Sequence, residues 1–340
     1  MIRAALLCLL ALIAAPARAQ DVASFYQGRQ VRLVSGSSSA ESTALYERAL
    51  ARFLTKHIPG NPAVVAETAP GAGGLTAANM VANVAARDGT VIGTAHGFVP
   101  LMPLFGMEGP RFDPNQLYYL GSLYRLTGLC IGMKRDGVAS LDDMRARETL
   151  VGTSGPGTEI ITFYNTLQRV HGAKLKVIRG YASSAHINLA MERGELQARC
   201  GVSWSSMKVS KPEWARGETV NILLQLRLTK DPALPDVPLL GDGVNDPADR
   251  AALAVLLASP ELGYPVFLPP GVPPERARAL RDAFGRVTRD PEFAAELARQ
   301  QLEFSPTDGE AMQAAIAGLY RSSPEIVARV RDLAVTREAR

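Results

Sequence analysis

Long apolar segments and an excess of one charge are both missing from most of this sequence. Beyond residues 4–15 no run is long and apolar enough to span a membrane, which takes about 20 residues. The 37 basic residues nearly balance the 33 acidic ones, so the composition does not favour a nucleic-acid partner. We also find no internal repeat and no low-complexity linker.

Histidine is scarce as well, and its spacing excludes the common zinc motifs. His57, His96, His171 and His186 are too scattered to form an H-E-x-x-H motif or a Cys/His zinc pattern. No segment has the Lys-Ser/Thr ending of a phosphate-binding P-loop. We therefore expect neither a metal nor a cofactor.

The first nineteen residues have the pattern of a secretory signal. Arg3 supplies the positive charge, residues 4–15 the apolar stretch, and Ala17-Arg18-Ala19 a small-x-small cleavage site. The apolar stretch is too short for an uncleaved spanning anchor. We expect cleavage after Ala19 and a soluble mature chain exported to a bacterial periplasm. Because the signal contains two basic residues and no acidic ones, the net charge then falls from +4 to +2.

Only three cysteines are present, and Cys8 would leave with the signal. Cys130 and Cys200 remain as an even pair in an oxidising compartment, which favours one disulfide between them. The alternative is two separately buried thiols, each acting as a small apolar residue.

The remaining chain alternates short β-rich runs with amphipathic helical patterns. This alternation predicts α/β units with mostly parallel sheets, and the length is sufficient for two lobes. Because no flexible linker separates them, we expect strands to cross between the lobes and a ligand cleft to lie there. The expected strands cover residues 31–35, 63–66, 90–95, 127–133, 149–153, 174–179, 197–202, 221–228 and 264–268, and the expected helices cover 41–57, 75–85, 158–171, 184–193, 274–287, 291–301 and one long C-terminal stretch.

Two glycine-rich segments each follow a predicted strand and precede a predicted helix. They are P-G-A-G-G-L at 70–75 and V-G-T-S-G-P-G-T at 151–158. Glycines let backbone N–H groups converge at a helix N-terminus, whose partial positive charge favours an anion. Either segment alone is explained as well by a turn. Together they predict one anionic ligand held from two sides, and valine at Gly73 or Gly74 should abolish binding while the fold persists.

Other polar side chains also follow predicted strands. His96 follows one strand in T-A-H-G-F, and Tyr181, Ser183 and Ser184 follow the strand that ends at Arg179. Their N–H and hydroxyl groups suit carboxylate oxygens. A structural histidine and a serine-rich helix cap explain the same residues.

A catalytic alternative depends on G-V-S-W-S at 201–205, which is one residue from the G-x-S-x-G nucleophile elbow. Ser205 replaces the final glycine that permits the tight strand-to-helix turn. An exported hydrolase with Ser203 as nucleophile stays open, as does a simple helix cap formed by Ser203 and Ser205.

Short segments spread over the expected mature chain follow the pattern of one known family. They are F-Y-Q-G-R-Q-V-R-L-V at 25–34, H-I-P-G-N-P at 57–62, A-P-G-A-G-G-L at 69–75 with A-A-N at 77–79, R-D-G-T-V-I-G-T at 87–94, R-C-G at 199–201, L-P-D-V-P at 234–238 and P-P-G-V-P at 269–273. Together they resemble the Bug-type periplasmic solute-binding proteins, the receptors of tripartite tricarboxylate transporters.

The resemblance implies a two-lobed type II periplasmic-binding-protein fold, a Venus flytrap in which a cleft closes on a small organic acid. The chain would be a monomer without enzymatic activity, and it would deliver its ligand to integral-membrane permease subunits. Lobe 1 would comprise residues 20–122 and 224–340, and lobe 2 residues 123–223. Main-chain amides, hydroxyls and water would hold the carboxylate, and the candidate binding residues are Ser37, Ser38, Ser39, Gly71, Ala72, Gly73, Gly74, His96, Ser154, Gly155, Thr158, Tyr181, Ser183, Ser184, Asn188 and Ser203.

Two departures from the family pattern concern the ligand. The loop at 35–42 lacks the usual paired glycines and carries Glu41, and Asn188 stands where the family often has an aspartate. Amides and aromatic acids therefore stay open beside simple carboxylates. A sensory co-receptor, which would bind a solute for a signalling partner, is an alternative to a transport receptor.

Overall fold

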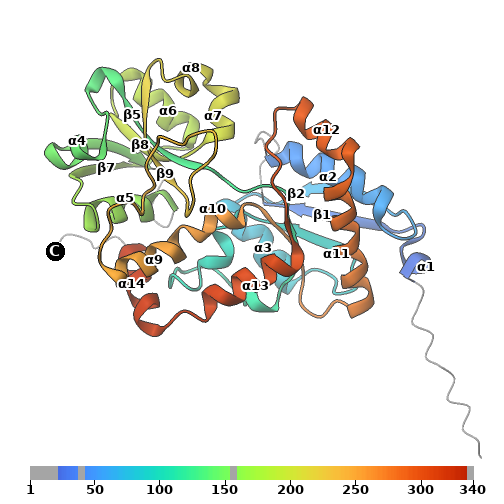
Figure 1. The fold of residues 1–340 in the computed structure, drawn as a ribbon. Helices are drawn as coiled ribbons and strands as arrows, with labels where there is room; N and C mark the ends of the chain where they lie inside the picture. Colours follow the sequence, from blue (N-terminus) through green and yellow to red (C-terminus); the bar gives the residue numbers. More distant parts are fainter. Residues whose placement is uncertain (1–21, 37–42, 154–158, 335–340) are drawn as a thin grey trace, which may run out of the picture.

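A computed structural model describes residues 22–36, 43–153 and 159–334, which form two β-sheets flanked by helices (Figure 1). The predicted signal segment and the loops 37–42 and 154–158 lie outside the described residues. Each described helix is too short or too polar to cross a bilayer.

The first sheet has the strand order β11-β4-β10-β3-β1-β2. Its strand β1 pairs in parallel with both β2 and β3, whereas β10 and β11 run antiparallel to their neighbours. The strands are β1 (Gln30–Ser35), β2 (Ala63–Thr68), β3 (Val91–Thr94), β4 (Tyr118–Ser122), β10 (Pro265–Leu268) and β11 (Thr307–Asp308).

Helices cover both faces of this sheet because consecutive strand residues point to opposite sides. Ile92 of β3 belongs to the apolar cluster formed with α2 and α11, and its neighbour Val91 belongs to the cluster formed with α3 and α13. The elements around this sheet are α1 (Val22–Tyr26), α2 (Thr43–His57), η1 (Ala72–Gly74), α3 (Leu75–Asn83), η2 (Val99–Leu101), η3 (Pro114–Gln116), α11 (Pro274–Arg289), α12 (Pro291–Arg299) and α13 (Gly309–Tyr320).

The second sheet has the order β7-β6-β8-β5-β9. Strand β6 is parallel to β7 and β8, and β5 is antiparallel to β8 and β9. The elements of this part are β5 (Gly128–Met133), η4 (Lys134–Asp136), α4 (Leu141–Ala146), β6 (Thr149–Thr153), α5 (Glu159–Arg169), β7 (Leu175–Arg179), α6 (Ser184–Arg193), β8 (Ala198–Ser203), α7 (Trp204–Ser210), α8 (Pro212–Ala215) and β9 (Val220–Leu226).

Both sheets are mixed, so the prediction of mostly parallel sheets is wrong. Parallel pairing is confined to β2-β1-β3 and β7-β6-β8, where helices connect successive strands. The strands on either side of the crossings, β4 with β10 and β5 with β9, pair antiparallel. Within the described residues no βαβ unit, which would make neighbouring strands parallel, connects the two members of either pair.

In the described chain one crossing between the sheets runs directly from strand to strand, as expected, whereas the other runs through two helices. Strand β4 leads through residues 123–127 directly into β5 of the other sheet, and β9 returns through α9 (Pro247–Leu256) and α10 (Ala258–Leu262) to β10. The exact lobe boundaries after residues 122 and 223 stay a prediction.

The C-terminal stretch is two helices rather than the single long one expected. Helix α13 ends at Tyr320, and α14 (Pro324–Ala334) begins at a proline, which has no backbone N–H to continue a helix. Helix α14 lies beside α5 and α9 (Figure 1), and the Asn165 side chain of α5 donates to the Ala334 carbonyl at 3.3 Å. Helix α14 is thereby attached to a helix that flanks the second sheet.

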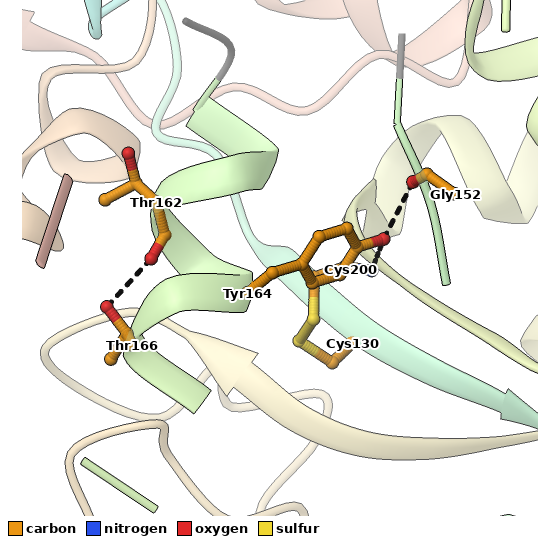
Figure 2. Close-up of a disulfide and its surroundings, with 6 residues drawn as sticks. All are labelled: Cys130, Gly152, Thr162, Tyr164, Thr166 and Cys200. Atoms are coloured by element: carbon orange, nitrogen blue, oxygen red, sulfur yellow. Dashed lines mark hydrogen bonds between the residues drawn. A yellow bond between two sulfur atoms is a disulfide. The ribbon is translucent and has the colours of Figure 1, made fainter. Parts of the chain in front are cut away.

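A disulfide joins Cys130 of β5 to Cys200 of β8, as the cysteine pairing predicted. Tyr164 of α5 lies beside it, and its hydroxyl donates to the Gly152 carbonyl at 2.9 Å and accepts from the Cys200 N–H at 3.3 Å (Figure 2). Burial raises the pKa of Tyr164 to about 12, so this hydroxyl stays protonated. The bridge and the tyrosine together connect β5, β6 and β8 to α5.

Loss of the disulfide should lower the free energy of unfolding by about 2–4 kcal/mol, because the bridge closes a long loop in the unfolded chain. The two cysteines are 70 positions apart. Urea denaturation of the oxidised protein and of protein refolded under reductant measures the difference. Equal midpoints, or two free thiols in unreduced denatured protein, would contradict the assignment.

Candidate ligand-binding site

A cavity of about 680 Å³ lies between the two sheets, with walls from both. One wall comes from α2, the end of β3, the crossing segment and α10, and the other from β5, α5, α6, β8 and α7. The lining residues are Thr43, Tyr46, His96, Tyr124, Leu126, Gly128, Glu159, Phe163, Ser183, Ser184, Ala185, Gly201, Ser203, Ser205, Ser206 and Pro260. This volume suits a small organic molecule.

Two tyrosines make much of the first wall apolar and neutral. The rings of Tyr46 and Tyr124 stack with centroids 4.3 Å apart at 27°, and the Tyr46 hydroxyl donates to the Glu303 carbonyl at 2.8 Å. Burial raises the pKa of both tyrosines, so neither ionises near neutral pH. The wall offers the ligand aromatic surface rather than charge.

His96 follows β3 and also faces this cavity. The ring nitrogen Nδ1 of His96 accepts a hydrogen bond from the Phe98 N–H at 3.2 Å. The backbone N–H of His96 donates to the Gly73 carbonyl at 3.2 Å. In the neutral imidazole this arrangement puts the ring proton on Nε2, which makes that nitrogen a donor. His96 can therefore donate to an oxygen of a ligand.

The start of α6 supplies the donors of the second wall. Ser183 occupies the N-cap position without a side-chain cap bond, because its hydroxyl contacts His186 Nδ1 at 2.9 Å instead. The first N–H groups of a helix have no partner within the helix, and they favour an anion. Ser183, Ser184 and Ala185 bring this end of the helix to the cavity.

Ser203 is a helix cap in the structure. Its Oγ accepts from the Ser206 N–H at 3.3 Å and contacts Ser205 Oγ at 3.0 Å. Within the described part of the chain, no histidine is hydrogen-bonded to it, so the nucleophile–base pair of a serine hydrolase is not assembled there. The described part of the chain also contains no cluster of three or more side chains that could hold a metal ion.

A second, smaller cavity of about 170 Å³ adjoins the first. Ser184, Gly201, Ser203 and Ser206 line both, so the two cavities are neighbours. Asn188 lines the smaller cavity, and its Oδ1 accepts a hydrogen bond from Arg199 Nη1 at 2.6 Å.

The predicted site residues fall into three groups. His96, Ser183, Ser184, Ser203 and Asn188 line one or both of the two cavities. Gly71, Gly73, Gly74 and Tyr181 line neither, although Gly73 is bonded to His96 and Tyr181 packs against the apolar cluster of the second sheet. The side chain of Ala72 lies outside the description. Ser37, Ser38, Ser39, Ser154, Gly155 and Thr158 lie outside the described residues.

The two glycines named for mutation differ in their surroundings. A Cβ on Gly74 would lie 3.0 Å from the Ala95 Cα, and a Cβ on Gly36 would lie 2.4 Å from the Gly74 Cα, so three backbone segments pass each other closely there. A Cβ on Gly73 would meet nothing nearer than the His96 Cβ at 4.0 Å. Gly74 thus lies in tight backbone packing, so a valine at this position would press on Ala95 and disturb the fold as well as any ligand contact.

The aromatic lining was missed by sequence reasoning. Tyr46, Tyr124 and Phe163 occupy apolar positions of helices or of the crossing segment, where the pattern indicates only a core residue. Arg199, which lines the smaller cavity, was missed as well, although a charged residue between apolar neighbours on a buried strand was a usable signal.

No family model and no curated protein matches the sequence, but many solved structures share its fold. A TctC solute-binding protein from Polaromonas aligns with 91% of this chain and 98% of its own, with a TM-score of 0.67 and 18% identity. The periplasmic binding protein BugD aligns with 92% and 100%, with a TM-score of 0.66 and 18% identity. MatC from Rhodopseudomonas palustris with bound malate aligns with 90% and 99%, with a TM-score of 0.62 and 18% identity. The prediction of a two-lobed periplasmic-binding-protein fold is confirmed.

The variants Gly73→Ala and Gly74→Ala should distinguish the stability cost of backbone strain from the stability cost of close packing. Both glycines have positive φ, at 65° and 97°, which costs an alanine about 1–2 kcal/mol. Gly74→Ala adds the contact with Ala95, so we expect a further loss of about 1–3 kcal/mol in the free energy of unfolding. Urea denaturation of the two variants measures this, and equal losses would show that the close packing at Gly74 is unimportant.

Proposed function

We propose that this chain is an exported solute-binding protein of the Bug type, which captures a small carboxylate between its lobes and delivers it to the permease of a tripartite tricarboxylate transporter. The observation that carries the proposal is the cavity of about 680 Å³ with walls from both sheets. A ligand that contacts both walls would stabilise the conformation in which the two walls are closed around it.

The chemistry of the cavity supports an anionic group on the ligand. The N-terminal turn of α6, several serine hydroxyls and His96 supply donors, and aromatic rings cover the rest of the ligand. A hydrolase would need Ser203 next to a base, whereas the hydroxyl of Ser203 is used as a helix cap. Capture and release without chemistry is the simplest use of such a cavity.

The resemblance supports the remaining parts of the proposal. They are periplasmic export after cleavage at Ala19, a monomeric receptor without cofactor or catalysis, and lobes that divide after residues 122 and 223. The malate bound to MatC supports a carboxylate as the ligand. A contribution from the loop 71–74 and from residues 37–39 and 154–158 also belongs to the proposal.

A thermal-shift screen of the mature protein tests the ligand class most economically. The panel contains malate, adipate, citrate, benzoate, aspartate and nicotinamide. A ligand present at a hundred times its Kd should stabilise the protein by about 2.7 kcal/mol. We expect at least one carboxylate of the panel to raise the melting temperature in this way.

A blocked-cavity variant ties any stabilisation to this site. Ser183→Trp places a large ring in the cavity without removing a helix-cap bond, and it should eliminate the shift. Leu189→Trp is the matched control, since Leu189 lies on the same helix, is exposed and lines neither cavity. Equal shifts in both variants would place the binding elsewhere.

Two further assays distinguish the alternatives. Ester hydrolysis that disappears in Ser203→Ala, without stabilisation by any panel compound, would favour the hydrolase. Uptake of the bound acid by cells that lack the gene separates a transport receptor from a sensory co-receptor, because only the former should impair uptake when deleted.

A further inference from the structure

Arg199 of β8 is a buried cation without an acidic partner. Its side chain is 2% exposed, and within the described residues no carboxylate forms an ion pair with it. The guanidinium bonds only to neutral groups: Nη1 donates to the Ser184 carbonyl at 3.0 Å and to Asn188 Oδ1 at 2.6 Å, and Nη2 donates to Ser184 Oγ at 3.4 Å. Nε is buried, and no described residue forms a hydrogen bond with it.

This arrangement is energetically costly for the protein alone. An isolated buried charge loses its hydration, and a buried N–H without an acceptor loses a hydrogen bond as well. Burial lowers the pKa of Arg199, but an arginine remains protonated under all ordinary conditions. The positive charge is therefore present and uncompensated.

Arg199 is one of the residues that line the smaller cavity of about 170 Å³, beside the main one. The other polar lining groups are the hydroxyls of Ser184, Ser203, Ser206 and Ser210, the amide of Asn188 and the ammonium of Lys211. Lys211 has its own acid, because it is ion-paired with Glu192. None of the described residues that line it is acidic, so this part of the lining is positive and rich in donors.

We propose that this smaller cavity is a carboxylate subsite, in which Arg199 binds a carboxylate of the ligand while the rest of that ligand occupies the main cavity. The inference rests on the proposed function, since it assigns the binding of one anionic group to a part of the same site. A carboxylate in this cavity would neutralise the charge of Arg199. A guanidinium is also the side chain best suited to bind a carboxylate through more than one N–H.

Glu159 gives the ligand a direction. This residue lines the main cavity, and its Oε1 is buried without a hydrogen-bond partner in the described part of the chain. A carboxylate next to Glu159 would be repelled, whereas a hydroxyl, amide or ammonium group could donate to it. The anionic end of the ligand is therefore directed toward Arg199 and its donor end toward Glu159.

Acetate is a sufficient probe of the subsite, because it is little more than the carboxylate itself. We expect it to shift the Nε–H resonance of Arg199 in a saturable way, whereas chloride at equal ionic strength should not. The resonance is assigned by its loss in Arg199→Gln. Arg193, an exposed arginine at the end of α6, is the internal control, and its signal should not move.

Two variants test the same assignment through binding. Arg199→Gln should weaken acetate, and the best carboxylate of the screen, by about 10- to 100-fold, since a hydrogen bond to a charged group is lost. Asn188→Asp keeps the size of the side chain and gives Arg199 an internal carboxylate. It should raise the melting temperature of the ligand-free protein and abolish the acetate response, while Arg193→Gln should change neither.

The possible outcomes distinguish this proposal from the general function. If a panel acid shifts the amide signals of Tyr46 and Ser183 but leaves the Arg199 signal and the Arg199→Gln affinity unchanged, the subsite is wrong and the binding function stands. If Arg199 responds to acetate while no panel compound stabilises the protein, the subsite stands and the ligand is a carboxylate other than those of the panel. If neither acetate nor any panel compound has an effect, both proposals are overturned.

Discussion

The rest of the structure depends on how residues 123–127 are held while they cross between the two sheets. The Leu126 N–H donates to the Pro260 carbonyl at 2.8 Å, and the Arg125 N–H donates to Ser305 Oγ at 2.9 Å, both in the part of the chain that carries the first sheet. At the other end the Thr127 carbonyl accepts from the Trp204 N–H at 2.9 Å. The crossing backbone is therefore fixed at both ends, and its residues Tyr124 and Leu126 form part of the first wall of the cavity.

Further contacts bridge the two parts of the molecule away from this crossing. Lys208 of α7 is ion-paired at 3.5 Å with Glu303, whose carbonyl also accepts from Tyr46. Burial raises the pKa of Glu303, so this pair depends on the lysine to keep the carboxylate ionised. On another side α14 packs against α5, and one apolar cluster extends from α3 to the buried face of the second sheet. The walls of the cavity are thus positioned by several independent contacts.

Much of this architecture could be predicted from the sequence, because it depends on patterns within short segments of the chain. Helix α6 begins and ends where the pattern of residues 184–193 places it, and the disulfide follows from a count of two cysteines. The pairing of strands near the crossings could not be predicted, because strand direction depends on which sheet each segment joins. The break before Pro324 was a local signal that the apolar periodicity obscured.

The candidate site was predictable only where polar residues follow strands. His96, Ser183 and Ser184 were found in this way, but Arg199 lies within a strand, and its lack of an acid is a fact about its neighbours in space. Tyr46 and Tyr124 are separated by 78 positions in the chain and stack only in the folded protein. At Gly74 the sequence suggested only a ligand contact, whereas the structure shows close backbone packing around this residue.

The most direct test of the account is a crystal structure of the mature protein soaked with the carboxylate that stabilises it most. The account predicts electron density for that acid between the two sheets, in contact with the start of α6 and with residues of both walls. An acid bound only on the outer surface, with water alone in the cavity at a saturating concentration, would contradict it.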